Sequence, residues 1–521
     1  MIPGRGRIAG RGRAFATWPL HPFLLAATFV INAAGTTAVD ARMIGRPFAI
    51  AIVLTGLLIL LALLILRDVR KAGIATTAIL ALNGAVSLFA IAGAVIERSS
   101  WWQSTLWTLL LVLTAALSGR LALKSLRRTD LRSIQRGLNL IAAILLLVVV
   151  GSLVLQGSAT QAWKDLTSGT SPHTPRASHK PDILLLLLDG YPRADTMQRV
   201  LGEGNESFVS ALRAQGFEVA RRSRANYTFT QLTMASMLHM THLVDLEAYR
   251  AISNRTAPED PTVRNLINEN PVFDRWRAEG YEIVSITPGI ERVSVLSAED
   301  VSDSGTISEF EYHLLRSTAM GALWSIADPA FLARNHHARV LHNLEEVEDL
   351  FQADTKIGGR FIWAHVLSPH MPAVFERDGS LRPVPFSSAF FADGGGDLVT
   401  PWEHRAALRN QIAYLNDRIE AVLESVIRRD PETVITLMSD HGSAVNFDWR
   451  RLDSDLDERF ANLFAWRTPG RADVFTDTQT TINVFPRLFN SYLGEEMPLL
   501  PDSTWAGVVN FIEVPNPDAG S

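Results

Sequence analysis

The chain has 521 residues, enough for two or three domains, and its formal net charge is −5. A chain with this balance has no general basic surface, so we expect no nucleic-acid partner. Cysteine is absent, which excludes disulfides, thiolate metal sites and a cysteine nucleophile. Hydrophobic residues make up 47% of the sequence, and they are unevenly distributed along it.

Long apolar segments with short connections fill the first part of the chain. Each approaches the roughly 20 residues with which a helix crosses about 30 Å of hydrocarbon. The segments are residues 15–37, 47–66, 72–96, 101–123 and 138–155. Buried core helices would show a polar face, which these segments lack, and a cleavable signal peptide would account for only one of them. We therefore predict an α-helical membrane domain of about five transmembrane helices within residues 1–157.

The basic residues are unevenly divided between the connections, which indicates the orientation of the helices. Most lie before the first segment or in the second and fourth connections: Arg5, Arg7, Arg11, Arg13, Arg67, Arg70, Lys71, Arg120, Lys124, Arg127, Arg128, Arg132 and Arg136. The other connections carry only Arg42, Arg46 and Arg98. Because the basic side faces the cytoplasm, we predict a multi-pass integral protein of the cell inner or plasma membrane with an extracytoplasmic second half.

The second half of the sequence is typical of an α/β domain. Residues 158–180 are polar and indicate a linker, the domain is expected over residues 181–505, and a tail at 506–521. The first apolar run, Ile183–Leu188, is too short to span a membrane and suits a strand buried on both faces of a parallel sheet. Further candidate strands lie at residues 281–287, 360–367, 433–439 and 462–467. Helical patterns between them, the clearest at residues 410–428, predict a mostly parallel sheet with helices on both faces.

Polar residues stand where three of these strands end. Asp189 follows the first strand, Asp440 and His441 follow the strand at 433–439, and His365 and His370 lie at or after the strand at 360–367. In open α/β sheets the ligand site lies beyond the carboxyl ends of the strands, so we expect these side chains at one edge. Carboxylate oxygen with imidazole nitrogen suits a divalent metal, Zn²⁺ or Mn²⁺, with Mg²⁺ as a further candidate. Each residue alone is equally typical of a turn or loop, so the prediction rests on the set.

A threonine at the start of a predicted helix is the candidate nucleophile. The helical pattern begins at Gln231, which places Thr230 at or near the N-cap. As a cap, Thr230 would only hold the first turn. As a nucleophile, it would meet a phosphate bound at the helix N-terminus, and a metal would lower the pKa of its hydroxyl. The sequence leaves both roles open, with Thr228 and Thr233 as neighbouring alternatives.

Four blocks of the sequence, in this order, resemble the alkaline phosphatase superfamily and its branch of sulfatase-like hydrolases and transferases. They are the strand ending in Asp189, the T-x-x-T-x-x-S from Thr230, the H-x-x-x-P-H-x-P of residues 365–372 and the SDHG of residues 439–442. The resemblance covers about residues 180–505. With membrane helices in front, the chain is similar to lipoteichoic acid synthases and lipid A phosphoethanolamine transferases, which carry an extracytoplasmic catalytic domain.

The resemblance implies a role for each block. The metal ligands would be Asp189, Thr230, Asp440 and His441, and Thr230 corresponds to the nucleophile of the transferases. His370 would contact the substrate phosphate, while His365 would serve a second metal or the substrate, or only pack in its strand. Sulfatases place x-Pro-x-Arg after the nucleophile, whereas this chain has Gln-Leu-Thr-Met at residues 231–234, so a true sulfatase is not expected. The single acid at position 189 favours a one-metal site.

The predicted function is that of a membrane-anchored, metal-dependent phosphotransferase. Through Thr230, it would move a phospho-alcohol head group from a lipid-borne phosphodiester donor to an envelope glycan or lipid acceptor. Transfer is inferred from the membrane anchor and the resemblance, and from no catalytic residue. A sulfatase-like phosphodiesterase or phosphatase that uses water is the alternative enzyme, and a non-catalytic module that binds the envelope is the alternative of another class.

Overall fold

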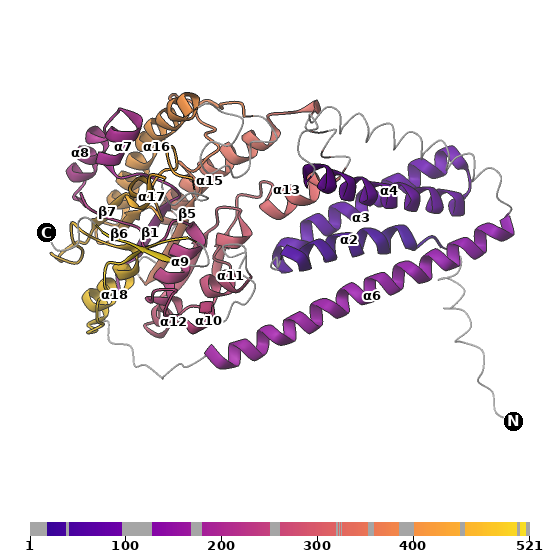
Figure 1. Cartoon of the computed structure of the whole chain (residues 1–521), viewed down its shortest axis with the longest axis horizontal. Coiled ribbons are helices and arrows are strands. Elements are labelled where there is room, and N and C mark those ends of the chain that lie inside the picture. The colour runs from indigo at the N-terminus through magenta and orange to yellow at the C-terminus, as the bar shows by residue number, and fades with distance from the viewer. Residues whose placement is uncertain are drawn as a thin grey trace. The chain divides into compact units, whose positions relative to one another are not determined.

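A computed structural model describes most of the chain (Figure 1). The described residues are 18–37, 41–95, 128–167, 180–250, 261–318, 321, 324, 326–352, 359–384, 401–448, 454–507 and 511–516. The chain divides into two compact units, which are treated separately below. The first unit comprises residues 1–170 with residues 309–327, and the second unit comprises residues 171–308 with residues 328–521.

Helices make up the first unit in the part of the chain that the structure describes. Those before residue 170 are α2 (His21–Thr37), α3 (Ala41–Leu66), α4 (Val69–Val95) and α6 (Arg128–Thr167), and α2 packs against the other three. Two described stretches are long and apolar enough to cross a membrane, Met43–Leu66 in α3 and Asp130–Ser152 in α6. Many of their apolar side chains stay exposed, as at Leu64 (69%) and Leu147 (71%). A large exposed apolar surface of this kind suits contact with lipid.

The expected count of about five transmembrane helices is not confirmed. α2, α3, α4 and α6 coincide with four of the five predicted segments, but only two described stretches have the length and composition of a span. A shorter apolar stretch, His21–Gly35, lies in α2. The predicted segment at residues 101–123 lies outside the described residues. α6 also reaches Thr167, well into the expected linker, because alanine, glutamine and lysine there favour a helix.

The second unit is built on a seven-stranded sheet (Figure 1), in the order β2-β7-β6-β1-β5-β3-β4. Strands β1, β3, β4, β5 and β6 are parallel, whereas β7 runs antiparallel to β6, and β2 antiparallel to β7. The mostly parallel sheet is thus confirmed, and the predicted strands correspond to β1, β3, β5, β6 and β7. The strands are β1 (Ile183–Leu188), β2 (Glu218–Val219), β3 (Glu282–Ile286), β4 (Asp300–Ser302), β5 (Arg360–Val366), β6 (Val434–Met438) and β7 (Phe464–Arg467).

Helices cover both faces of this sheet, so β1 is fully buried. Alternate residues of a strand point to opposite faces. On one face, Leu184 and Leu186 share a buried cluster with α7 (Ala194–Leu201), α8 (Glu206–Ala214), α15 (Phe331–Gln352) and α16 (Pro401–Arg429). On the other face, the ring of Phe361 contacts α12 (Pro271–Ala278) and α18 (Val484–Leu488). This double cover explains the uninterrupted apolar sequence of β1.

Several shorter helices and strands lie between and after these elements. They are α9 (Thr230–His239), α10 (Glu247–Arg250), α11 (Pro261–Asn268), α13 (Glu309–Arg316), α17 (Leu456–Phe460), β8 (Thr504–Ala506) and β9 (Ile512–Val514). β8 and β9 pair antiparallel, and the ring of Phe511 contacts that of Tyr227 (5.2 Å between centroids). Strand β9 therefore lies within the stretch 506–521 that the sequence indicated as a tail.

Candidate active site

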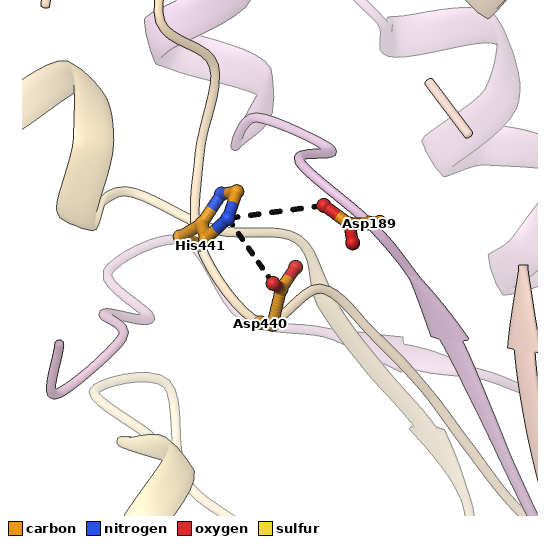
Figure 2. Close-up of side chains that lie close together, drawn as sticks. All are labelled: Asp189, Asp440 and His441. Atoms are coloured by element: carbon orange, nitrogen blue, oxygen red, sulfur yellow. Dashed lines mark ion pairs between the residues drawn. The ribbon is translucent and has the colours of Figure 1, made fainter. Parts of the chain in front are cut away.

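Three candidate ligands meet at the carboxyl edge of the sheet, where β1 and β6 are neighbours (Figure 2). Asp189 follows β1 directly, and Asp440 and His441 follow β6. Nε2 of His441 lies 3.1 Å from Oδ2 of Asp440 and 3.8 Å from Oδ1 of Asp189. One ligand atom from each residue lies within 4.8 Å of the others, and all three residues are buried. Their positions at strand ends therefore bring together three of the predicted site residues.

Hydrogen bonds across the two strand ends hold this arrangement. The N–H of Gly190 donates to Oδ1 of Asp440 (3.1 Å), and the N–H of Tyr191 donates to the hydroxyl of Ser439 (2.8 Å). Gly190 has a φ of 75°, a left-handed conformation that favours glycine, and this conformation turns the chain immediately after Asp189. The two ligand-bearing loops are thus fixed to each other by the chain itself.

Two carboxylate oxygens of the site fit a bound cation. Oδ1 of Asp189 and Oδ2 of Asp440 are buried and accept no hydrogen bond from the described residues. A buried carboxylate oxygen without a donor is destabilising, and one divalent cation would satisfy both oxygens. Carboxylate oxygens with an imidazole nitrogen are ligands that Zn²⁺ and Mn²⁺ accept. The donor set therefore fits a divalent metal and leaves its identity open.

The surrounding histidines keep Asp189 ionised. Burial alone raises the pKa of this carboxyl, but the charge of His370, the contact with His365 and the charge of His441 together lower it by more. The net direction is a pKa below the usual value for aspartic acid. Opposite charges and hydrogen bonds favour the charged form in this way, and the charged form is the one that binds a metal.

Thr230 is the first residue of α9, one residue earlier than the predicted helix start. The N-cap position is Phe229, without a side-chain capping bond. The Thr230 hydroxyl oxygen lies 3.4 Å from Oδ2 of Asp189 and 3.2 Å from Nε2 of His441. Thr233, one of the alternatives, instead donates its hydroxyl to the carbonyl of Tyr227 (3.3 Å). The geometry therefore selects Thr230 as the hydroxyl beside the candidate ligands.

His365 and His370 reach the same edge from β5, which pairs in parallel with β1. Nε2 of His365 lies 3.4 Å from Oδ2 of Asp189, and its side chain is fully buried. The backbone N–H of His370 donates to the carbonyl of Asp189 (2.8 Å). Nδ1 of His370 lies 2.6 Å from the carbonyl of Met371, which orients the ring. Both histidines thus lie beside the acidic ligand, while the roles predicted for them stay predictions.

Arg459 of α17 joins the nucleophile segment to a ligand loop, and the sequence did not single it out. Its Nε donates to the carbonyl of Thr228 (2.8 Å), two residues before Thr230, and Nη1 lies 3.5 Å from the carbonyl of Gly442, next to His441. The arginine is 2% exposed. An arginine on a short helix carries no local signal for such a role, because its contacts depend on how α17 packs against both loops.

Glu458 and His336 are two further buried residues near the site that the sequence did not indicate. Glu458 precedes Arg459 and accepts hydrogen bonds from the backbone N–H groups of Val445 (2.7 Å) and Asn446 (2.9 Å), in the loop after the SDHG block. His336 lies in α15, and burial lowers its pKa to about 3. The sequence around His336 is typical of an ordinary helix, and that around Glu458 shows no periodic pattern.

Comparison with known proteins finds likenesses among solved structures alone. No family model matches the chain, and no curated protein matches it. The integral membrane protein lipooligosaccharide phosphoethanolamine transferase A from Neisseria meningitidis is 13% identical over 92% of this chain and 95% of that chain, with a TM-score of 0.40. The C-terminal periplasmic domain of EcEptC from Escherichia coli is 15% identical over 65% of this chain and 96% of that chain, with a TM-score of 0.38.

A sulfatase is also among the similar structures. A 2-O GAG sulfatase is 13% identical over 61% of this chain and 72% of that chain, with a TM-score of 0.39. The similar structures thus include a phosphoethanolamine transferase, one of the groups to which the sequence is similar, and a sulfatase. At these identities and TM-scores no function is transferred from these structures, and the function proposed for this chain rests on its own side chains.

Proposed function

We propose that the second unit is a metal-dependent phosphotransferase, anchored in a membrane by the helices of the first unit. The position of the Thr230 hydroxyl supports this most, because it lies 3.2 Å from Nε2 of His441 and 3.4 Å from Oδ2 of Asp189. A nucleophilic hydroxyl needs an activating group within such a distance. The exposed apolar helices of the first unit favour a lipid-borne phosphodiester as donor, and an envelope glycan or lipid as acceptor.

The proposed reaction has two steps. First, the Thr230 hydroxyl oxygen attacks the donor phosphorus: the new bond joins phosphorus to this oxygen, the bond from phosphorus to the lipid alcohol breaks, and the lipid alcohol leaves with the proton. The phospho-alcohol head group is then held on Thr230. In the second step an acceptor hydroxyl attacks the same phosphorus, the bond to Thr230 breaks, and the proton of the acceptor returns to Thr230.

Each residue of the site has a part in this proposal. Asp189, Asp440 and His441 would hold the metal, which would supply a Lewis acid and lower the pKa of the Thr230 hydroxyl. His370 would donate a hydrogen bond to the phosphoryl oxygens. The N-terminus of α9, at Thr230, favours negative charge. Such fixed groups stabilise the charge that develops during phosphoryl transfer.

The test is the mass of the intact full-length protein after incubation with phospholipid vesicles and Mn²⁺ or Zn²⁺. We expect wild type to gain one phospho-alcohol adduct, whose mass identifies the head group, and Thr230→Ala to gain none. Thr233→Ala is the matched control, because this threonine lies one turn along the same helix and contacts the carbonyl of Tyr227. It should keep the adduct.

The other functions predict different outcomes when bound metal and the released product are also measured, with glycan or lipid acceptors added. Release of free phospho-alcohol into water, without transfer to added glycan or lipid acceptors, would indicate a phosphodiesterase. A folded protein with neither bound metal nor adduct would contradict catalysis and favour the envelope-binding module. An adduct that persists in Thr230→Ala would contradict the assigned nucleophile.

A further inference from the structure

Residues 309–327 belong to the first unit, although the chain before and after them belongs to the second. The chain therefore passes between the units three times, at residues 170–171, 308–309 and 327–328. The single linker predicted from the sequence would give one passage. The contacts made by residues 309–327 within the first unit explain this division, and they begin with α13.

α13 packs on the adjoining ends of α2 and α3. Phe310 is 2% exposed and forms a buried cluster with Val30 and Ala34 of α2. Apolar residues of the three helices pack around this cluster: Ala33, Ile44, Phe48, Ala51 and Leu314. Burial of a phenylalanine side chain away from water is strongly favourable. Phe310 therefore anchors α13 on the first unit.

An ion pair fixes the level of α13 along α3. The guanidinium of Arg46 bonds to both carboxylate oxygens of Glu311, with Nε 2.6 Å from Oε1. Arg46 lies in the first turn of Met43–Leu66, the 24-residue stretch that can cross a membrane. An arginine near the end of a span places its charge at the level of the lipid headgroups, because charge is not tolerated in hydrocarbon. Glu311, and α13 with it, therefore lie at headgroup level.

The far end of the segment exposes large apolar side chains. Trp324 is 39% exposed and Ile326 is 52% exposed. They belong to the same unit as the exposed leucines of α3, among them Leu57 and Leu60. Tryptophan is enriched where membrane meets water, and an isoleucine gains free energy when lipid replaces water around it.

We propose that residues 309–327 form an interfacial anchor whose partner is the lipid bilayer. α13 docks on α2 and α3 at headgroup level, and Trp324 and Ile326 insert into the lipid surface. The anchor would restrain the second unit at residues 308 and 328, in addition to the connection after α6. This inference stands independently of the proposed phosphotransfer, since none of its residues is part of the site.

The absence of cysteine from the sequence makes a labelling experiment specific. Full-length Ile326→Cys is labelled with an environment-sensitive fluorophore and reconstituted in phosphatidylethanolamine–phosphatidylglycerol vesicles that contain lipids with a quencher high in the acyl chain. We expect a blue-shifted emission and loss of most of the fluorescence. The matched control is Ala421→Cys, an exposed alanine of α16 in the second unit, which should stay unshifted and unquenched.

A charge reversal tests the docking of α13. In the Ile326→Cys protein, Glu311→Lys places a second positive charge beside Arg46 and should reduce the quenching. Adding Arg46→Glu re-forms a pair of opposite charges and should restore the quenching. Equal emission and equal reaction with a water-soluble maleimide at positions 326 and 421 would overturn the anchor. Protection from maleimide without lipid quenching would also overturn it, because a protein surface would then cover Ile326.

Discussion

Three hydrogen bonds from one loop converge on the carboxylate of Glu458, which is fully buried. The donors are the hydroxyl of Ser443 and the N–H groups of Val445 and Asn446. Glu458→Gln directs an amide NH2 toward one of these donors, which then loses its acceptor. We expect the free energy of unfolding to fall by about 1–3 kcal/mol. Metal affinity should weaken by about 10–100-fold, because the loop begins directly after the ligand His441.

Chemical denaturation and metal titration of the purified protein check this prediction. The matched control is Asp457→Asn, one residue earlier in α17, because Asp457 is 65% exposed and pairs with Arg224 at 3.0 Å. Arg224 is itself buried (2% exposed), so Asp457→Asn should also lower the free energy of unfolding. Among the described residues, however, the Asp457 side chain bonds to Arg224 and not to the loop after His441, so this variant should keep wild-type metal affinity. If Glu458→Gln also kept wild-type metal affinity, support of the loop by Glu458 would be contradicted.

His336 gives the stability of the protein a pH dependence. Burial lowers its pKa to about 3, and the charge of Arg339 lowers it further in the same direction. Below the unfolded value of 6.5, the unfolded chain binds a proton that the native state does not. Stability is therefore lost as the pH falls from about 6.5 toward 3, with a slope of up to about 1.4 kcal/mol per pH unit from this residue.

The measurement is the free energy of unfolding of wild type and His336→Gln between pH 8 and pH 5. We expect the variant to lose less stability over this range, even if its stability at pH 8 is lower. Parallel curves for the two proteins would contradict the assignment to His336. The difference between the two proteins removes the contribution of groups that titrate in both.

At the scale of elements, a buried ion pair joins the amino ends of two strands, and a backbone hydrogen bond ties a third to them. Asp182 is fully buried and precedes β1, and Arg360 begins β5 with Nε 3.0 Å from Oδ2 of Asp182. The carbonyl of Asp182 accepts the N–H of Val434 in β6 (2.9 Å). Arg360→Met removes the guanidinium from the buried carboxylate of Asp182. Breaking a buried pair in this way destabilises a protein by about 3–5 kcal/mol.

Thermal unfolding in detergent, followed by circular dichroism, checks this loss. Arg428→Met is the matched control, because Arg428 makes an exposed pair with Glu424 on α16 (side chains 69% and 64% exposed). It should leave the melting temperature almost unchanged. Methionine keeps an apolar stem of similar length, so a loss of equal size in the two variants would contradict a specific role of the buried charge.

The elements differ in how far the sequence predicted them. β1 was predictable because a strand covered on both faces needs an uninterrupted apolar run, and its end then located Asp189. The same reasoning located Asp440 and His441 after β6. Glu458 and Arg459 were not predictable, because helix α17 packs over the site by tertiary contacts that leave no periodic pattern. β8 and β9 were missed because strands of three residues are too short for a reliable alternation signal.

At the scale of the whole molecule, residues 309–327 show what the sequence order conceals. The sequence predicted one membrane half followed by one domain, because every long apolar run comes first. Yet α13 packs on α2, more than two hundred positions earlier in the chain. A short helix with mixed polar and apolar residues gives no membrane signal by composition, so only its partners reveal where it belongs.

The proposed metal should stabilise the whole second unit, because its ligands come from loops after two different strands. Binding to the native state alone adds about 2.7 kcal/mol to the free energy of unfolding when the free metal is 100-fold above its Kd. We expect an excess of chelator to lower the melting temperature of wild type and Mn²⁺ or Zn²⁺ to restore it.

Asp440→Asn should respond to neither, because one of the two oxygens without donors becomes part of a neutral amide. Thr230→Ala should still respond, since Asp189, Asp440 and His441 remain. A melting temperature unaffected by chelator in all three proteins would contradict a metal at this site, whereas a response in wild type and Thr230→Ala alone would separate metal binding from the nucleophile.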